Sequence, residues 1–285
     1  MQKKESTLEE YHKRMNVVVE YINNHLGEDI DLTLLAEISN FSPFHFHRIM
    51  KAFLGEPIWT FIVRTRIETA ARLLRYTDMT VESIAYRVGY GAPSSLSKSF
   101  KQFYGVSPNQ FRNNKDYIIM KPSNVKPELN ITISVEERPS KNLIYIRLTG
   151  PYDSHDYAGT WGRLYQYIGE LQIPFNQVEH IAIYPDDPKV TAPDKLRSEL
   201  SLAVPQPVVP KGEIGVKDLA GGKYAVFRYK GPYTNMAAVY DTIYAHWIPE
   251  KEYKLRDAYV YECYLNNPAD TAPDDLLTEI CVPVE

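Results

Sequence analysis

The chain has 285 residues, a formal net charge of −4 and an apolar fraction of 44%, enough for two ordinary globular domains with buried cores. It contains no run of about 18 apolar residues, which excludes a predicted membrane span. Its charged N-terminal stretch lacks the apolar segment of a secretory signal. The two cysteines, Cys263 and Cys281, make no disulfide framework. We therefore expect a cytoplasmic protein with reduced thiols.

Charge is unevenly distributed along the chain. Residues 40–115 contain 11 Lys and Arg against 4 Asp and Glu, whereas residues 121–285 contain 17 against 23. A basic segment beside an acidic one suggests a domain that binds a polyanion, joined to a domain with another task.

Up to about residue 115 the apolar residues recur at helical spacing. Capping residues and glycines divide this stretch into seven expected helices. The helix starts are expected at Asp31, Ser42, Thr80 and Ser107, and the ends at Gly27, Gly55, Gly89 and Gly105. The helices then cover about residues 15–26, 32–38, 43–53, 57–76, 81–88 and 93–104, with a last short one from 108.

One pattern occurs twice within this helical stretch. It runs from Leu34 to Ile58 and, more clearly, from Ile84 to Arg112. Each copy has a short helix with a small residue, Ala36 or Ala85, then a tight turn and a second helix that opens at a proline. This is a helix-turn-helix, and two such units could place two helices in successive major grooves of DNA.

The second helix of the first unit has an apolar face and a polar face. Phe46, Ile49, Met50 and Phe53 fall at core spacing, and the expected groove-facing residues are Phe44, His47, Arg48 and Lys51. Arg48 could pair with guanine, His47 with a base acceptor or a phosphate, and Phe44 with a thymine methyl group.

The second unit offers fewer discriminating side chains. Its expected core residues are Leu96, Phe100 and Phe103, and its expected outward residues are Ser94, Ser95, Ser97 and Lys98. Serine hydroxyls pair with several base edges. Lys98, Lys101 and Arg112 are therefore expected to contact phosphates, with an ordinary solvated surface role as the alternative for each.

The stretch Ile84–Arg112 resembles the motif of AraC-family transcriptional regulators. The matching residues are Ile84-Ala85, Val88-Gly89-Tyr90, Leu96, Phe100-Lys101, Gly105-Val106-Ser107-Pro108 and Phe111-Arg112. The resemblance covers about residues 8–115 and implies a bipartite domain that binds double-stranded promoter DNA. It also implies that Phe44, His47 and Arg48, with Ser94, Ser95 and Lys98, face the bases.

Residues 121–130 contain two prolines without apolar periodicity and are interpreted as a linker. Beyond it the apolar period becomes two, which predicts strands at 131–135 and 143–148. A repeat follows, since Gly150-Pro-Tyr recurs at Gly231-Pro-Tyr, and the segment from Tyr184 recurs from Tyr264. Each half is expected to be strand, helix, strand, strand, with helices near 154–171 and 234–248 and an extra strand leading into the first half. We expect a duplicated α+β domain with a pseudo-twofold axis, and such an axis often borders a cleft.

Aromatic residues are abundant in this half, with 15 of the 22 tyrosines after Met120. They either fill the core or line a pocket for a flat or cationic ligand. Glu199 and Glu279 are equivalent by the repeat and lie in apolar strands, where an unpaired carboxylate is costly. A bound cation would relieve that cost, and the alternative is an ion pair with Lys or Arg on a neighbouring strand.

This half also resembles the GyrI-like small-molecule-binding domain. The marks are the two Gly-Pro-Tyr motifs, Tyr184-Pro-Asp-Asp-Pro, and Thr278-Glu279-Ile-Cys-Val-Pro. The resemblance covers about residues 130–285 and implies a cleft for hydrophobic, often cationic, compounds with a glutamate near its floor, corresponding to Glu279. The second half departs from Asp-Asp-Pro with Asn266-Asn267-Pro268. The expected effector-binding residues are Trp161, Tyr184, Glu199, Tyr233, Trp247, Tyr264 and Glu279.

The sequence thus predicts a multidomain α and α+β protein: an all-α double helix-turn-helix at 8–115 and a duplicated antiparallel α+β domain at 131–285. Its expected function is sequence-specific transcriptional regulation under control of a small effector, with no metal, cofactor or enzymatic activity. The alternatives are a small-molecule hydrolase fused to a DNA-binding domain, and a DNA-binding or toxin-sequestering protein with no effector response. RNA polymerase and a second copy are possible partners, although two helix-turn-helix units let a monomer reach two grooves.

Overall fold

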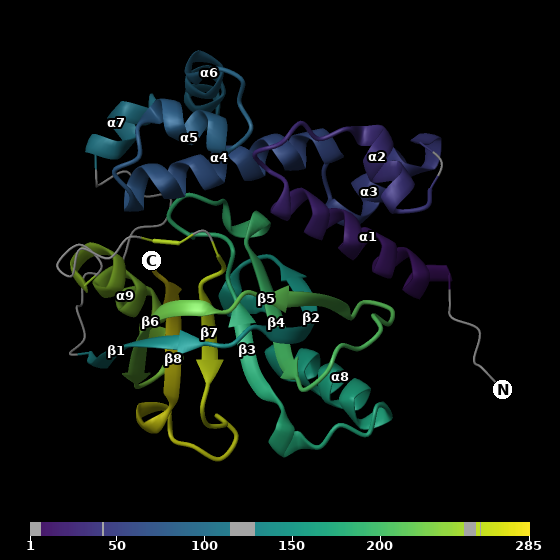
Figure 1. Cartoon of the computed structure of the whole chain (residues 1–285), viewed down its shortest axis with the longest axis vertical. Helices are drawn as coiled ribbons and strands as arrows, with labels where there is room; N and C mark the ends of the chain where they lie inside the picture. The colour runs from purple at the N-terminus through teal and green to yellow at the C-terminus, as the bar shows by residue number, and fades with distance from the viewer. Residues whose placement is uncertain (1–6, 42, 115–128, 248–254, 257) are drawn as a thin grey trace. The chain divides into compact units, whose positions relative to one another are not determined.

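The computed structural model describes residues 7–41, 43–114, 129–247, 255–256 and 258–285. The chain divides into two compact units. One comprises residues up to 119 with 189–191 and 210–215, and the other comprises the remainder (Figure 1). The predicted cap Ser42 and most of the predicted linker, 121–128, lie outside the described residues. No helix in the described part is long and apolar enough to cross a membrane.

The helical unit confirms the predicted order of helices. Its elements are α1 (Thr7–Asn24), α2 (Leu32–Ile38), α3 (Pro43–Leu54), α4 (Ile58–Tyr76), α5 (Val81–Arg87), α6 (Pro93–Tyr104) and α7 (Pro108–Asn113). The predicted caps form where they are described: Asp31 accepts from the Thr33 amide, and Thr80 from the Ser83 amide. The helix that ends at Tyr104 is closed by Gly105 at φ 76°, a left-handed conformation that glycine adopts readily.

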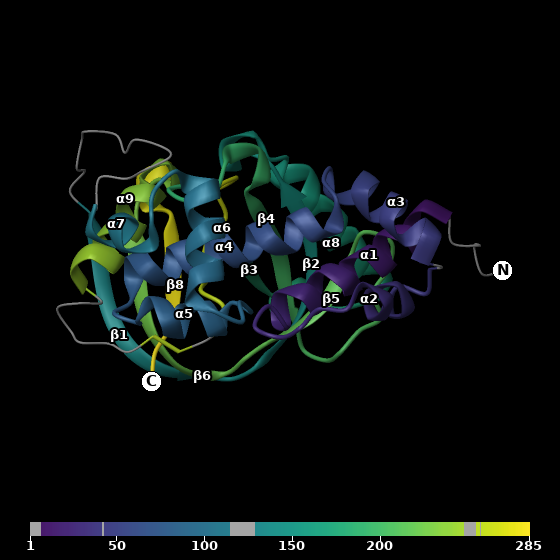
Figure 2. The same ribbon diagram turned by 90° about the horizontal axis from the view of Figure 1, so that it is seen from above.

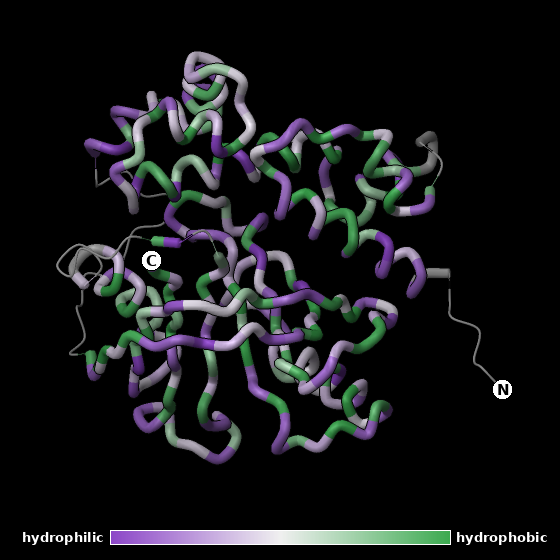
Figure 3. The backbone as a smooth tube through the Cα atoms, viewed as in Figure 1, coloured by the Kyte–Doolittle hydropathy of each residue, from purple (hydrophilic) through white to green (hydrophobic). Residues whose placement is uncertain are grey.

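Two apolar cores form in this unit, and α4 contributes to both. Ile58, Phe61 and Ile62 belong to the core shared with α1, α2 and α3, whereas Ile67 and Leu74 belong to the core shared with α5, α6 and α7. Figure 3 shows apolar and hydrophilic segments alternating along these helices, as expected when one face of each helix is buried.

One predicted core residue is wrong. Phe103 is 43% exposed, and its neighbour Tyr104 is buried instead, with 5% exposed. Leu96, Phe100 and Tyr104 follow one another at four-residue steps and lie on one helix face. The Tyr104 ring then packs against Phe100 and Phe111, at centroid distances of 4.8 and 5.3 Å.

The second unit is built on one eight-stranded sheet with the order β1-β6-β8-β7-β3-β4-β2-β5. Its elements are β1 (Asn130–Arg138), β2 (Lys141–Thr149), α8 (Tyr157–Glu170), β3 (Glu179–Ile183), β4 (Arg197–Val204), β5 (Gly215–Leu219), β6 (Gly222–Lys230), α9 (Met236–Thr242), β7 (Tyr261–Tyr264) and β8 (Leu277–Pro283). A π-helical turn, Ile243–Trp247, extends α9.

The predicted duplication is present as β2-α8-β3-β4 and β6-α9-β7-β8. Each half is preceded by a strand, and the second of these, β5, was not predicted. The leading strands are exchanged: β1 pairs with β6 of the second half, and β5 lies beside β2 of the first (Figure 2). The exchanged strands form the two edges of the sheet, and the pairing of β7 with β3 joins the halves.

The pseudo-twofold axis passes between β3 and β7, which pair antiparallel. Ala182 faces Glu262 in this register, and the same two residues are equivalent by the 80-residue repeat. A pair that is both facing and equivalent must lie at the axis. The duplication therefore places one carboxylate there, opposite a methyl group.

Candidate DNA-binding face and effector site

The exposed face of α3 has the polarity predicted from the sequence. Phe46 and Met50 are fully buried in the first core, whereas His47, Arg48 and Lys51 are exposed. The backbone of Phe44 lies in the first turn of α3, and its side chain lies outside the described residues. The described side chains place hydrogen-bond donors and positive charge on one face of this helix.

The exposed face of α6 is also as predicted. Leu96 and Phe100 are fully buried. The outward residues Ser94, Ser95, Lys98 and Lys101 are exposed, and Ser97 is half-buried. This helix offers small hydroxyls near its N-terminus and lysines further along, so its positive charges suit phosphates better than base edges.

Arg112 makes hydrogen bonds within the helical unit. Its side chain is half-buried, and its Nε donates to the Leu74 carbonyl at 3.3 Å. One Nη donates to the Met79 carbonyl. These acceptors lie in the last turn of α4 and in the segment before α5, so the guanidinium holds α7 against the end of α4. These bonds give Arg112 a structural role, and a phosphate contact by its side chain stays a prediction. The sequence could not reveal the bonds because backbone carbonyls leave no signature.

Glu262, which the sequence reasoning missed, is the most unusual carboxylate of the second unit. It lies on β7 and is only 3% exposed. Its carboxylate accepts hydrogen bonds from the hydroxyls of Tyr240 at 3.0 Å and Tyr264 at 2.8 Å. No Lys or Arg of the described chain forms an ion pair with it. Burial raises its pKa to about 7, although both tyrosine hydrogen bonds act in the opposite direction.

Tyrosines surround this carboxylate with the symmetry of the repeat. Tyr152 and Tyr184 meet edge to face at 5.0 Å, and their equivalents Tyr233 and Tyr264 do so at 5.5 Å. The hydroxyls of Tyr184 and Tyr264 lie 3.1 Å apart. The Glu262 charge in turn raises the pKa values of Tyr184 and Tyr264, beyond the larger effect of burial. All four rings therefore belong to one cluster at the axis.

Two tryptophans were also predicted to contact the effector. Trp161 on α8 lies 6.4 Å from the Tyr264 ring, edge to face, and 5.4 Å from His180. It therefore adjoins the tyrosine cluster. Trp247 is partly buried and packs with the apolar core beneath α9, which is the core alternative for these aromatic residues.

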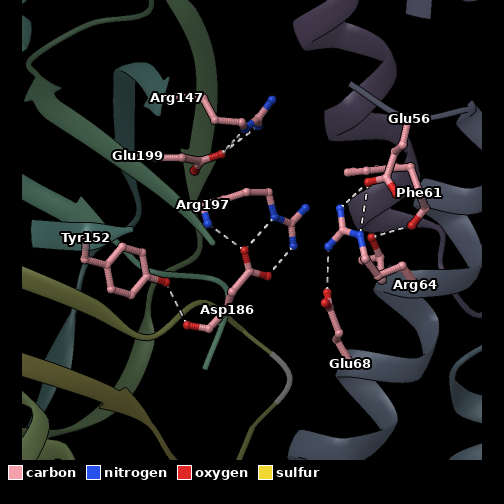
Figure 4. A network of polar contacts seen from close by, with 10 residues as sticks. Glu56, Phe61, Arg64, Glu68, Arg147, Tyr152, Asp186, Arg197 and Glu199 are labelled. Carbon is pink, nitrogen blue, oxygen red and sulfur yellow. Dashed lines mark hydrogen bonds and ion pairs between the residues drawn. The ribbon is translucent and has the colours of Figure 1, made fainter. Parts of the chain in front are cut away.

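Glu199 and Glu279 are ion-paired, which is the alternative that the sequence left open. Glu199 meets Arg147 at 2.6 Å and Lys217 at 2.5 Å. Figure 4 shows the contact with Arg147. Burial alone would raise the pKa of Glu199, and the two cations overcome this and hold it at about 2. Glu279 contacts Arg138 at 3.0 Å and also Arg228. Effector contact by these two glutamates stays a prediction.

The two kinds of glutamate lie on opposite faces of the sheet. Ile280, which pairs with Glu262, packs with Val239 of α9. Glu279 alternates with Ile280 and so points to the other face, as predicted. The equivalent of Glu262 in the first half is Ala182, so a comparison of Glu199 with Glu279 did not lead to it.

The departure from Asp-Asp-Pro in the second half has a structural explanation. Asp186 accepts from the Arg197 amide at 2.8 Å and binds its guanidinium at 2.8 and 2.6 Å (Figure 4). In the second half, Asn266 accepts from the Leu277 amide at 2.9 Å. Leu277 is the equivalent of Arg197 and has no guanidinium. A neutral amide is therefore enough to accept the hydrogen bond from its backbone N–H. The motif therefore holds a turn together rather than a ligand.

No group of three or more His, Cys, Asp or Glu within the described part is placed to hold a metal ion. The architecture defines a class of protein with an AraC-type double helix-turn-helix and a duplicated α+β domain.

Comparison with known proteins agrees with both parts. Residues 131–285 match the GyrI-like small molecule binding domain, and residues 35–114 match a helix-turn-helix domain. Because the first match covers more than half of the sequence, the chain belongs to the family with GyrI-like small molecule binding domains.

Three similar proteins each match a little over a third of this chain. The uncharacterized HTH-type transcriptional regulator YbfP of Bacillus subtilis (strain 168) is 31% identical over 102 residues, 36% of this chain and 35% of that protein. The HTH-type transcriptional activator RhaS of Enterobacter sp. (strain 638) is 30% identical over 109 residues, 38% of this chain and 39% of that protein. The DNA-binding domain of AdpA, solved in complex with a target DNA, is 29% identical with a TM-score of 0.35, covering 35% of this chain and 91% of that chain. The match thus spans little more than a third of the two curated relatives.

Proposed function

We propose that this protein is a transcriptional regulator that binds promoter DNA through α3 and α6 and a small monocationic organic effector at the tyrosine cluster around Glu262. The observation that carries the effector assignment is a buried carboxylate at the pseudo-twofold axis that is hydrogen-bonded by two tyrosine hydroxyls. Family membership and the two exposed recognition helices support the rest.

The charge of the ligand follows from the electrostatics of Glu262. Its pKa of about 7 leaves the carboxylate poised between two protonation states at neutral pH. A cation would favour the ionised form, and the surrounding aromatic faces would add about 0.5–2 kcal/mol of cation–π attraction each. Because Ala182 occupies the equivalent position of the other half, the axis offers one negative charge. A single positive charge therefore matches it.

The test compares benzyltrimethylammonium with neopentylbenzene, which has the same shape and no charge. Binding to the full chain is followed by quenching of tryptophan fluorescence, because Trp161 adjoins the cluster. The cation should bind more tightly than the neutral compound by at least tenfold at pH 8, and Glu262→Gln should remove the difference. Equal affinities for the two compounds in the wild type, or a preference unchanged in Glu262→Gln, would refute the assignment.

Glu279→Gln serves as the matched control, since Glu279 is an ion-paired carboxylate on the other face. It should keep the preference for the cation. Loss of the preference in Glu279→Gln alone would instead support the carboxylate predicted from the sequence.

Sequence-specific DNA binding is tested with the full chain on its own promoter region and on random duplexes of equal length. Specific regulation requires a higher affinity for the promoter at the same salt concentration, since phosphate contacts alone are insensitive to sequence. Equal affinities and equal salt dependence would contradict the proposal.

Effector binding could act through dimerisation or through contact with RNA polymerase. Sedimentation with and without the cation separates the first route from the second, because only the first changes the mass of the protein in solution. The hydrolase alternative predicts turnover of an electrophilic small molecule that disappears in Glu279→Gln, with the carboxylate as the acid or base.

A further inference from the structure

The middle of α4, where the two helix-turn-helix units join, is polar and buried. The last buried residue of the first apolar core on this helix is Ile62 and the first buried residue of the second is Ile67, with the partly buried Val63 also packed against the second core. Arg64 and Arg66 lie between them and are 7% and 8% exposed. Apolar packing therefore fixes each unit to its own end of α4, and the boundary between the units is left to polar contacts.

The two arginines make different contacts. Arg64 bonds locally, to Glu56 at 2.7 Å and to Glu68 at 2.9 Å (Figure 4). Arg66 reaches a distant segment: its Nε donates to the Leu26 carbonyl at 3.1 Å, and one Nη donates to the Glu28 carbonyl at 2.6 Å. The planar guanidinium thus holds α4 against the turn that follows α1.

Glycines let the turn after α5, in the second helix-turn-helix unit, approach Arg66 and the turn that follows α1. Gly89 has φ 82°, and a Cβ there would lie 2.3 Å from the Leu26 carbonyl oxygen and 2.7 Å from Arg66 Cζ. A Cβ on Gly27 would lie 2.7 Å from the Arg87 carbonyl oxygen. Distances this short exclude any larger residue without a shift of the backbone. The end of α1, the middle of α4 and the end of α5 therefore converge.

We propose that this polar joint, formed by residues 26–28, Arg66 and residues 87–89, fixes the angle between the recognition helices α3 and α6 and so sets the spacing of half-sites that the protein accepts. Arg66 is a positioning residue in this scheme. The joint links the helix-turn-helix unit that carries α3 directly to the turn that precedes α6. The connection between the two units through this joint is therefore a few backbone atoms long.

The geometry of DNA determines how far a half-site moves when the spacing changes by one base pair. One helical turn spans about 34–36 Å and 10–10.5 base pairs, so one inserted base pair displaces a half-site by about 3.4 Å and rotates it by about 35°. Long helices curve gently, with radii of about 60–100 Å, so α4 by itself leaves some freedom in the angle between the units. A second connection between the units is therefore what can make spacing selective. This inference rests on the proposed DNA binding.

The first experiment measures the distance between α3 and α6 in the protein without DNA. Nitroxide labels on cysteines placed at the exposed positions Ala52 in α3 and Gln102 in α6 report the distance between the helices by pulsed electron resonance. The labelled chain carries Cys263→Ala and Cys281→Ala. The otherwise unaltered protein should give one narrow distance distribution, and Arg66→Met should broaden its width at least twofold.

The matched control is Arg64→Met, which removes an equally buried guanidinium two residues away whose bonds are local. It should reduce thermal stability and leave the distance distribution narrow. An unchanged distribution in Arg66→Met would overturn the proposal, and so would equal broadening in Arg64→Met, because either result reduces Arg66 to a stabilising residue.

The second experiment uses a duplex selected from a random library by the wild-type chain, and derivatives with one base pair inserted or deleted between its half-sites. Wild-type affinity should fall at least tenfold on these derivatives, and Arg66→Met affinity less than threefold. Binding to a duplex with one half-site should be the same for both proteins. If Arg66→Met retains the tenfold penalty, the joint does not set spacing. If the wild type selects no sequence, the proposed function fails. The distance measurement still shows whether Arg66 fixes the angle between α3 and α6.

Discussion

Replacing Glu262 by Gln should change how the stability of the second unit depends on pH. Glu262 has a pKa of about 7 in the folded protein because it is buried, against an ordinary value of 4.5. Between these values the folded state binds more protons than the unfolded state. The free energy of unfolding should therefore fall as the pH rises through this window and level off above about pH 8. Gln has no proton to lose, so this fall should be missing from Glu262→Gln.

The magnitude follows from the same pKa values. Each pKa unit corresponds to about 1.4 kcal/mol, so the wild type should lose about 3 kcal/mol relative to Glu262→Gln between pH 4.5 and pH 8. Most of this change falls between pH 5 and pH 7, because these values lie inside the window bounded by the two pKa values. The difference between the two proteins removes the contributions of the other titrating groups.

The assay is urea unfolding of the full chain with Trp59→Phe, so that the remaining tryptophans, Trp161 and Trp247, report on the second unit alone. Glu199→Gln is the matched control, because the Lys217 and Arg147 charges hold the pKa of Glu199 at about 2 despite its burial. Its stability difference from the wild type should be unfavourable and flat between pH 5 and pH 8. A flat difference for Glu262→Gln, or one that favours the wild type increasingly at high pH, would refute the reasoning.

Three further outcomes are expected. In a binding-site selection, Arg48→Ala should relax sequence preference, whereas Lys98→Ala should weaken all sequences alike and reduce the slope of log affinity against log salt by about one. Arg112→Ala should lower the stability of the helical unit by about 1–3 kcal/mol, since its donors bind the Leu74 and Met79 carbonyls. It should leave the slope of log affinity against log salt unchanged. A changed slope would indicate that Arg112 contacts a phosphate. Asp186→Asn should lower the free energy of unfolding by about 3 kcal/mol, because it leaves Arg197 buried without its carboxylate. Adding Arg197→Leu gives the combination found in the other repeat and should recover most of this loss. Urea unfolding of both variants checks this, and no recovery would contradict the explanation of the motif.

Local signals in the sequence were enough for the helical unit. Helix caps and left-handed glycines act over three or four residues, so Asp31, Thr80 and Gly105 mark their helix ends without reference to the rest of the fold. Helical spacing places a residue on a face to within about one position. That limit explains why Phe103 was assigned to a core that Tyr104 occupies.

The effector site was less accessible to sequence reasoning. The repeat predicted the duplicated domain and the faces of Glu279, Ile280 and Cys281. It did not predict β5, whose Gly-Val-Lys-Asp-Leu sequence has little alternation. It also directed attention to the equivalent pair Glu199 and Glu279, whereas the unusual carboxylate is the one without an equivalent.

Sequence by itself therefore determined which helices and which strands other than β5 form, that the second domain is a duplication, and which family the chain belongs to, because caps, periodicity and motifs are properties of neighbouring residues. Only the tertiary structure decided which buried charges are paired. Arg147 and Lys217 reach Glu199 from two other strands, and Glu262 accepts hydrogen bonds from two tyrosine hydroxyls at the axis. The free energy of a buried charge depends on groups distant in sequence, and strand order and register bring those groups within a few ångströms.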